Sequence, residues 1–296
     1  TVHCSLFTVH CSLFTVHCKE VIMSYEQQQI KAIRVWQGQA PKLSSVLLGM
    51  AFAPATKLVD MVIPQAALHA ALEAACSMGE KLANPDAIIK LANISHIGEL
   101  FYADLALCDS LANTTHDRAI AMAAAEGGVT GASGLIGVAV DIPTLMTLAL
   151  RTIYQTALCY GFELKGEEGR QVVLRIFGVA SANSLKEKEA ALVSLVAIKQ
   201  MLQQQTWAQI QQTAFATMGK EALVFAIKDL AAQLGINLTK RKALTIVPMI
   251  GAAVGAAVNA SFIKDVGWAA RRTFQEMWLL QHGQHAQHLL SYQPSN

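Results

Sequence analysis

Charged residues are scarce in this 296-residue chain. Asp, Glu, Lys and Arg together make up 15% of it, against about a quarter in an average soluble protein, while apolar residues make up 53%. The formal net charge is only +2, which is too small to indicate a nucleic-acid partner. Runs of β-branched residues are few and there are only 7 prolines, so the composition favours helices over strands. We therefore expect an all-α protein that is unusually apolar for a soluble one.

Paired cysteines are missing from the main part of the chain. Residues 1–18 read TVHCSLFTVHCSLFTVHC, a repeat that no folding constraint requires, and we interpret it as an upstream extension with Met23 as the natural first residue. The alternative is a metal site built from the Cys and His residues of this repeat. Beyond the repeat, Cys76, Cys108 and Cys159 are widely spaced and form no CxxC pair. This pattern indicates reduced thiols in a cytoplasmic protein.

The glycine-rich stretch 127–137 lacks the known phosphate-binding signatures. A P-loop requires Lys-Ser or Lys-Thr after its glycines, and a dinucleotide fingerprint requires GxGxxG after a strand; neither is present. A catalytic-serine elbow requires GxSxG, but Ser133 is followed directly by Gly134 and then Leu135. We therefore expect no cofactor.

Two long segments combine small residues with almost no charge. In residues 127–162 only Asp141 and Arg151 are charged, and residues 243–263 carry no charge at all. The second segment is long enough to span a bilayer, but it is mostly Ala, Gly and Val and includes a proline and an asparagine. We favour a helix buried in the protein against the first segment. The glycines expected to allow close helix contact are Gly127, Gly128, Gly131, Gly134, Gly137, Gly251 and Gly255.

A narrow polar stripe is predicted inside the first segment. Asp141-Ile142-Pro143 is typical of a helix start, with an acceptor side chain for free backbone amides and a proline in the first turn. Four polar side chains of the following helix fall within about 80° of one another at 100° per residue. They are Thr144, Thr147, Arg151 and Gln155. Two interpretations stay open: a solvent-facing helix edge, or a polar groove in which Asp141 and Arg151 hold a ligand or partner.

Amphipathic helices are predicted along most of the chain. The segments are 24–38, 64–83, 97–125, 170–180, 184–205 and 217–234. Residues 113–116 are the expected break in the third of these. We expect one domain at 23–280 with roughly eight to eleven helices and the two Gly/Ala-rich segments packed centrally. Residues 1–22 form the upstream extension and residues 281–296 a polar flexible tail.

Basic and amphipathic features flank the second apolar segment. Lys240, Arg241 and Lys242 precede it, and an amphipathic helix ending near Trp278 follows it, with its charged residues gathered on one side. Such features are typical of contact with anionic lipid. We therefore expect a membrane-associated accessory or lipid-binding protein.

The alternative is a hydrolase or a metal-dependent enzyme. It would use Glu126, Asp141 and Arg151 around the glycine turn, and carboxylates with a raised pKa would favour it. However, the sequence shows no nucleophile paired with a base. The spacing of His116, Asp117 and Glu126 matches no metal-ligand signature, so we expect a polar surface there and no metal site.

The two apolar segments resemble the two signature blocks of the EcsC family of bacterial proteins. The blocks read GGVTGASGLIGVAVDIPTLMTLALRTIYQTALCYGFEL and IVPMIGAAVGAAVNASFIKDVGWAARRTF, and the opening MSYEQQQIKAIRVW is similar to typical family starts. The resemblance covers about residues 23–280. It implies a cytoplasmic protein acting at the inner membrane, with membrane lipid or a transporter as partner, because the founding member is encoded beside a bacterial ABC transporter. The family has no established catalytic residues to carry over.

Overall fold

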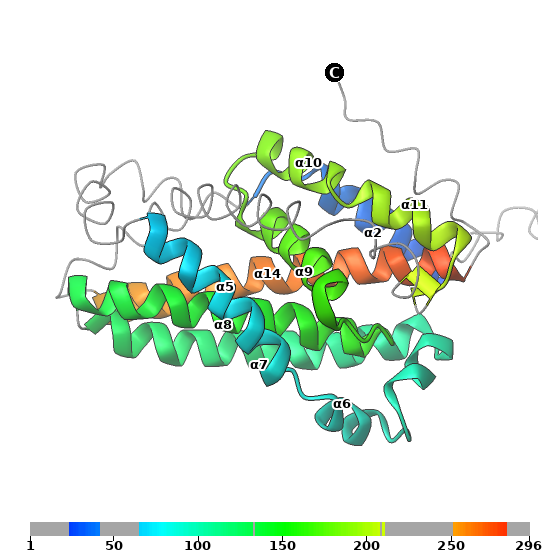
Figure 1. Cartoon of the computed structure of the whole chain (residues 1–296), viewed down its shortest axis with the longest axis horizontal. Coiled ribbons are helices and arrows are strands. Elements are labelled where there is room, and N and C mark those ends of the chain that lie inside the picture. The colour runs from blue at the N-terminus through cyan, green and yellow to red at the C-terminus, as the bar shows by residue number, and fades with distance from the viewer. Residues whose placement is uncertain (1–23, 42–64, 133, 208, 211–250, 283–296) are drawn as a thin grey trace, which may run out of the picture.

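The structure, a computed structural model, describes residues 24–41, 65–132, 134–207, 209–210 and 251–282 (Figure 1). Every regular element in these residues is a helix, and the helices pack into one domain, which confirms the predicted all-α class. Three predicted features lie outside the described residues. They are the helix at 217–234, the basic residues Lys240–Lys242 (called the basic step below) and the repeat at 1–18.

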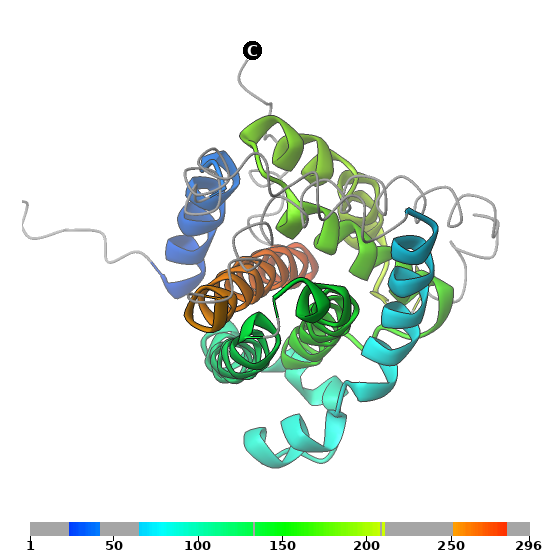
Figure 2. The same ribbon diagram turned by 90° about the vertical axis from the view of Figure 1, so that its left-hand side faces the viewer.

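Three long helices form the centre of the fold. They are α7 (Leu105–Ala132), α8 (Gly134–Cys159) and α14 (Gly251–Gln281). Figure 2 looks nearly along them and shows them side by side, with α14 packed most extensively on α7 and also on α8. The two Gly/Ala-rich segments therefore lie centrally, as the sequence predicts.

Shorter helices surround this centre. They are α2 (Tyr25–Gly38), α5 (Gln65–Leu82), α6 (Pro85–Ala92), the 3-10 helix η1 (Ile97–Tyr102), α9 (Gly166–Ser181), α10 (Leu185–Val193) and α11 (Val196–Gln204). Helix α5 crosses α8, while α9 packs on α14 and carries α10. Helix α2 lies against the outer side of α14 and also contacts α7 and α10.

The starts of several helices are fixed by side-chain caps that the sequence signals. Ser24 and Gln27 form a reciprocal capping box at α2. Asn84 caps α6 just before Pro85, and the Ser184 side chain accepts a hydrogen bond from the Glu187 amide at the start of α10. These local bonds satisfy amides that the first helical turn leaves free.

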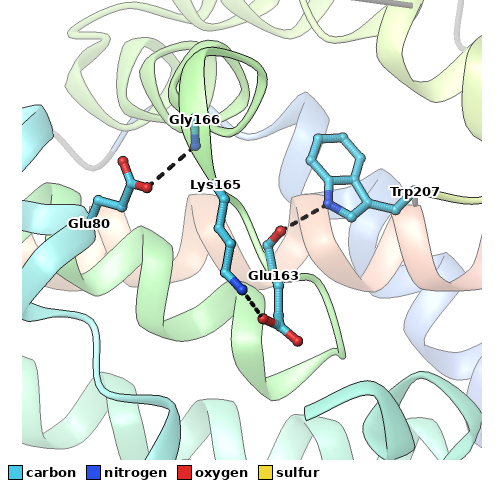
Figure 3. Close-up of polar contacts among 5 residues, drawn as sticks. All are labelled: Glu80, Glu163, Lys165, Gly166 and Trp207. Atoms are coloured by element: carbon cyan, nitrogen blue, oxygen red, sulfur yellow. Dashed lines mark hydrogen bonds and ion pairs between the residues drawn. The ribbon is translucent and has the colours of Figure 1, made fainter. Parts of the chain in front are cut away.

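The connection from α8 to α9 is held by polar contacts to neighbouring helices (Figure 3). The Gly166 amide donates to the Glu80 carboxylate of α5 at 3.3 Å, and the Trp207 indole donates to the Glu163 carbonyl at 3.2 Å. Lys165 and Glu163 form an exposed ion pair at 2.6 Å. Gly166 has a positive φ of 66°, which a glycine adopts without strain.

The predicted break at residues 113–116 is wrong, because α7 runs through it without interruption. Its polar side chains bond along the helix rather than ending it. Asn113 donates to Asp117, and the Thr114 hydroxyl donates to the Ser110 carbonyl, both one turn away. The long contact with α14 then supplies the packing that most helical stability requires.

The predicted helix start at Asp141 is also wrong. Helix α8 begins at Gly134, and Pro143 lies inside it. An interior proline removes one backbone hydrogen bond, which disfavours a helix. Here Asp141 is buried, and its carboxylate accepts hydrogen bonds from Thr130 on α7 and Asn259 on α14, so tertiary contacts hold the segment helical.

Helix α14 joins the second apolar segment to the predicted amphipathic helix as one continuous element. Residues 243–250 lie outside the described residues. No helix in the described part of the chain is long and apolar enough to cross a membrane. The amphipathic helix was expected to present its charged side to a lipid surface. Instead Arg271, Gln275 and Glu276 on that side are buried against other helices. Their hydrogen-bond partners inside the protein make this burial possible.

Candidate functional site

Two of the predicted site carboxylates meet at a buried asparagine. The Asn259 side-chain nitrogen donates to Glu126 and to Asp141, each at 2.7 Å, and Thr130 donates to Asp141 at 2.8 Å. Asn259 is fully buried. This cluster ties α7, α8 and α14 together from inside the core.

At the same place the backbones of α7 and α14 approach each other closely. A Cβ atom added to Gly127 would overlap the Gly255 carbonyl oxygen and lie 2.7 Å from the Asn259 side chain. Two of the predicted glycines therefore face each other across this contact. Gly128, Gly131, Gly134, Gly137 and Gly251 also lie within these three helices.

Arg151 and Gln155 lie at the junction between α5 and α6. The Arg151 guanidinium donates to the Leu82 carbonyl at 3.1 Å, at the end of α5. The Gln155 side chain accepts from the Asn84 amide at 2.7 Å and donates to the Asn84 carbonyl at 2.8 Å. Both side chains thus satisfy backbone groups that the chain leaves free between two helices.

The structure does not bring the whole polar stripe to one place. Asp141 and Arg151 are ten residues apart on α8, so they lie about 15 Å apart along its axis. Thr144 is exposed, and the Thr147 hydroxyl donates to the carbonyl of Pro143 within the helix. In the part of the chain that the structure describes, no three His, Cys, Asp or Glu side chains are placed to hold a metal ion. Ligand binding by this stripe stays a prediction.

A groove that the sequence did not indicate lies between α2, α9, α10 and α14. It encloses about 830 Å³, within the range of small-molecule sites. Its apolar lining includes two tryptophans, Trp36 and Trp268, with alanine, valine and proline side chains. Its residues come from three distant parts of the sequence, 28–41, 179–188 and 261–272, so no local pattern could reveal it.

The charged lining of this groove is mostly cationic. Lys31, Lys188, Lys264 and Arg272 line it, against a single carboxylate, Asp265. Among the described residues, neither the Lys31 nor the Lys264 amine has a hydrogen-bond or ion-pair partner. An apolar hollow with an excess of positive charge suits a ligand that combines an apolar body with an acidic group.

The protein family can be assigned from comparison with known sequences. The model of the EcsC protein family matches residues 27–279. The chain belongs to the EcsC family. The match spans nearly all the described helices, so the predicted resemblance is confirmed.

Two relatives in Bacillus subtilis (strain 168) are similar to part of this EcsC-family chain. "Uncharacterized protein YdbA" is 26% identical over 164 residues, 55% of each chain. "Protein EcsC" is 25% identical over 153 residues, which cover 52% of this chain and 56% of the relative. The chain thus spans about half the length of the curated relatives it matches. No solved structure matches it.

Lys188 is the most deeply buried cation of the groove in this EcsC-family protein. Its ammonium donates to the carbonyls of Trp36 and Gln39, the latter at 2.9 Å, and lies 4.1 Å from the centre of the Trp36 ring. Burial lowers the pKa of Lys188 to about 8, although the charge of Asp265 acts in the opposite direction.

The α2 wall of the groove is attached by polar side chains as well as by the buried Ile30 and Ile33. Tyr25 donates to Asp109 of α7 at 2.6 Å, and Gln37 donates to Glu276 of α14 at 3.1 Å. Glu276 also forms a buried ion pair with Lys199 of α11 at 2.6 Å. Sequence analysis missed this network because its members lie far apart along the chain.

His116 is buried on α7, whereas we expected a polar surface there. Its Nε2 lies 3.1 Å from the Lys264 carbonyl, and its ring meets Trp268 edge to face. Gly267 makes room for it, since a Cβ atom there would overlap the imidazole. Burial, with the nearby charge of Arg271, lowers the pKa of His116 to about 4. Asp117, its neighbour in sequence, is exposed as predicted.

Proposed function

We propose that this EcsC-family protein binds an anionic amphiphile, such as a lipid with an acidic head group, in the groove between α2, α9, α10 and α14. The main support for this proposal is that two tryptophans and four cations line one cavity of about 830 Å³. Apolar lining favours an acyl chain, while Lys188 and Arg272, which are not exposed, attract an acidic head more strongly than they would in water.

The proposal places the protein at the cytoplasmic face of the inner membrane as a peripheral protein. Anionic lipids at that surface attract basic segments, at about 1 kcal/mol per basic residue. The step Lys240–Lys242 provides such a segment in the sequence. A membrane transporter as partner is the further part of the proposal, and it rests on the resemblance alone.

Vesicle flotation tests the lipid proposal. The full chain is mixed with vesicles of phosphatidylcholine, or with vesicles in which part of it is replaced by phosphatidylglycerol. We expect binding only to the acidic vesicles. The variant Lys264→Glu reverses one charge of the groove without removing a hydrogen bond of its amine, and it should reduce the bound fraction.

The matched control is Lys90→Glu, an exposed lysine on α6 far from the groove lining. It should bind like the wild type. No binding to acidic vesicles, or equal losses in both variants, would contradict the proposal. A triple alanine variant of Lys240, Arg241 and Lys242 separates the contribution of the basic step from that of the groove.

A further inference from the structure

We infer that Lys188 recognises the acidic head group of the groove's ligand, so that the site selects a phosphate-bearing amphiphile over an uncharged one. This inference rests on the proposed function and adds to it the chemical class of the ligand and the residue that selects it.

Lys188 has more donors than the oxygen acceptors around it fill. An ammonium has three N–H donors. Two of them point to the carbonyls of Trp36 and Gln39, at the end of α2, where backbone carbonyls have no partner within the helix. Among the described residues no third oxygen or nitrogen acceptor faces this ammonium, whose other close neighbour is the Trp36 ring, 4.1 Å away. An oxygen acceptor in the groove that Lys188 lines can therefore take the remaining donor.

Two buried lysines of this protein differ in their partners. Lys199 and Lys188 are each only 5% exposed. Lys199 is paired with the Glu276 carboxylate at 2.6 Å. Lys188 has no carboxylate within ion-pair distance in the described part of the chain, and Asp265 acts on it only through space. A buried charge held by neutral carbonyls and an aromatic ring, without a carboxylate, is costly, and a ligand anion would supply the missing opposite charge.

An anion beside Lys188 would meet further positive charge in the groove. Lys264 and Arg272 of α14 line the same groove, and the buried Nε of Arg272 has no hydrogen-bond partner among the described residues. An acidic head beside Lys188 would thus lie among further cations. The two tryptophans and the small apolar side chains of the lining leave the rest of the cavity to an acyl chain.

Isothermal titration calorimetry on the full chain tests the inference. The ligands are dodecyl phosphate and uncharged dodecyl maltoside, both below their micelle concentrations, and inorganic phosphate. We expect the wild type to prefer dodecyl phosphate over dodecyl maltoside by about ten- to a hundred-fold, the value of one hydrogen bond between charged groups. Inorganic phosphate should bind far more weakly than dodecyl phosphate.

The variant Lys188→Met should lower this preference by about ten-fold or more and leave the affinity for dodecyl maltoside unchanged. Lys186→Met changes an exposed lysine on the same helix, and it should keep the wild-type preference. If Lys188→Met fails to fold, Lys188→Gln replaces it, because its amide can still donate to a backbone carbonyl. The same ratio of the affinities for dodecyl phosphate and dodecyl maltoside is then measured.

The outcomes separate the two proposals. If the wild type binds neither amphiphile, or binds inorganic phosphate as tightly as dodecyl phosphate, the proposed function fails and the inference with it. If the wild type binds both amphiphiles equally, or if Lys188→Met weakens both by the same factor, the inference is overturned while amphiphile binding stands.

Discussion

The two halves of α14 contact their neighbours in opposite ways. In the first half, Gly255 meets Gly127 of α7 almost backbone to backbone, and the short Asn259 side chain bonds to Glu126 and Asp141. In the second half, long side chains reach outward. Arg272 and Glu276 bond to residues of α2 and α11.

This difference explains where the groove lies. Small residues let two helices approach until no space remains between them, whereas long side chains set a larger separation. The contact between α7 and the first half of α14 therefore has no room for a ligand. The side of α14 that faces α2 carries longer side chains, and residues 261–272 in the middle of the helix line the cavity there. The close contact with α7 and the cavity thus lie on different sides of α14.

The largest effect is expected at the buried ion pair of the second half. Lys199→Met leaves the Glu276 carboxylate buried without its cation, and we expect a loss of about 4 kcal/mol in the free energy of unfolding. Urea unfolding measures it. The double variant Lys199→Met with Glu276→Gln removes both charges and retains an acceptor for Gln37, so it should recover most of the loss.

The exposed pair Lys165–Glu163 is the control, because its 2.6 Å distance is the same and its side chains are exposed. Lys165→Met should cost less than about 1 kcal/mol. Equal losses from the two lysine variants would show that burial does not set the strength of the contacts in the second half of α14.

The next largest loss of stability is expected at the contact between α7 and the first half of α14. Gly127→Ala places a methyl group against the Gly255 carbonyl and the Asn259 side chain, where two backbones would have to separate. We expect a loss of about 3 kcal/mol, the upper range for overpacking. Gly38→Ala is the control, since a Cβ atom at that helix end meets nothing within 4 Å. A Gly127→Ala protein as stable as the wild type in thermal and urea unfolding would refute the backbone contact.

The sequence predicted much of the fold because its signals are local. Caps such as Ser24, Asn84 and Ser184 act within one helical turn, and apolar periodicity needs only neighbouring residues. Local rules also produced the errors. Pro143 and the polar run 113–116 disfavour a helix by themselves, but contacts with distant helices outweigh that preference.

The groove could not be predicted for the same reason. Lys188 is followed by a glutamate in the sequence and resembles an ordinary solvent-facing lysine. Only the packing of α2 shows that its ammonium lies over Trp36. Likewise, the charged side of α14 fits a membrane-surface helix until α2, α7 and α11 are seen to cover it.

A smaller effect concerns the place where the two modes of contact meet. His116 fits against Gly267 midway along α14 and has a pKa of about 4, below its ordinary value of 6.5. The unfolded chain therefore binds more protons between these values, so stability falls as the pH drops through this window. Between pH 6.5 and 4.5 we expect His116 to account for a loss of about 2 kcal/mol.

Urea unfolding at both pH values measures this loss. His116→Gln should reduce the pH dependence by that amount, because glutamine does not titrate but can still donate to the Lys264 carbonyl. The exposed His96→Gln variant should keep the wild-type pH dependence. A His116→Gln protein with an unchanged pH dependence would mean that this histidine is not held neutral between the helices.

The smallest effect tests how α2 is attached. Tyr25→Phe removes one of three donors to Asp109, and Tyr160 and Gln275 remain to satisfy that carboxylate. We expect a loss of only about 1 kcal/mol in global stability. Hydrogen exchange should nevertheless become faster in α2 while α7 and α14 stay protected, because the Tyr25 hydroxyl is one of the contacts that attach α2 to α7. Tyr102→Phe, at an exposed tyrosine, serves as the control. Equal acceleration in all three helices would show that α2 opens only with the whole fold, and the two halves of α14 would then act as one cooperative unit.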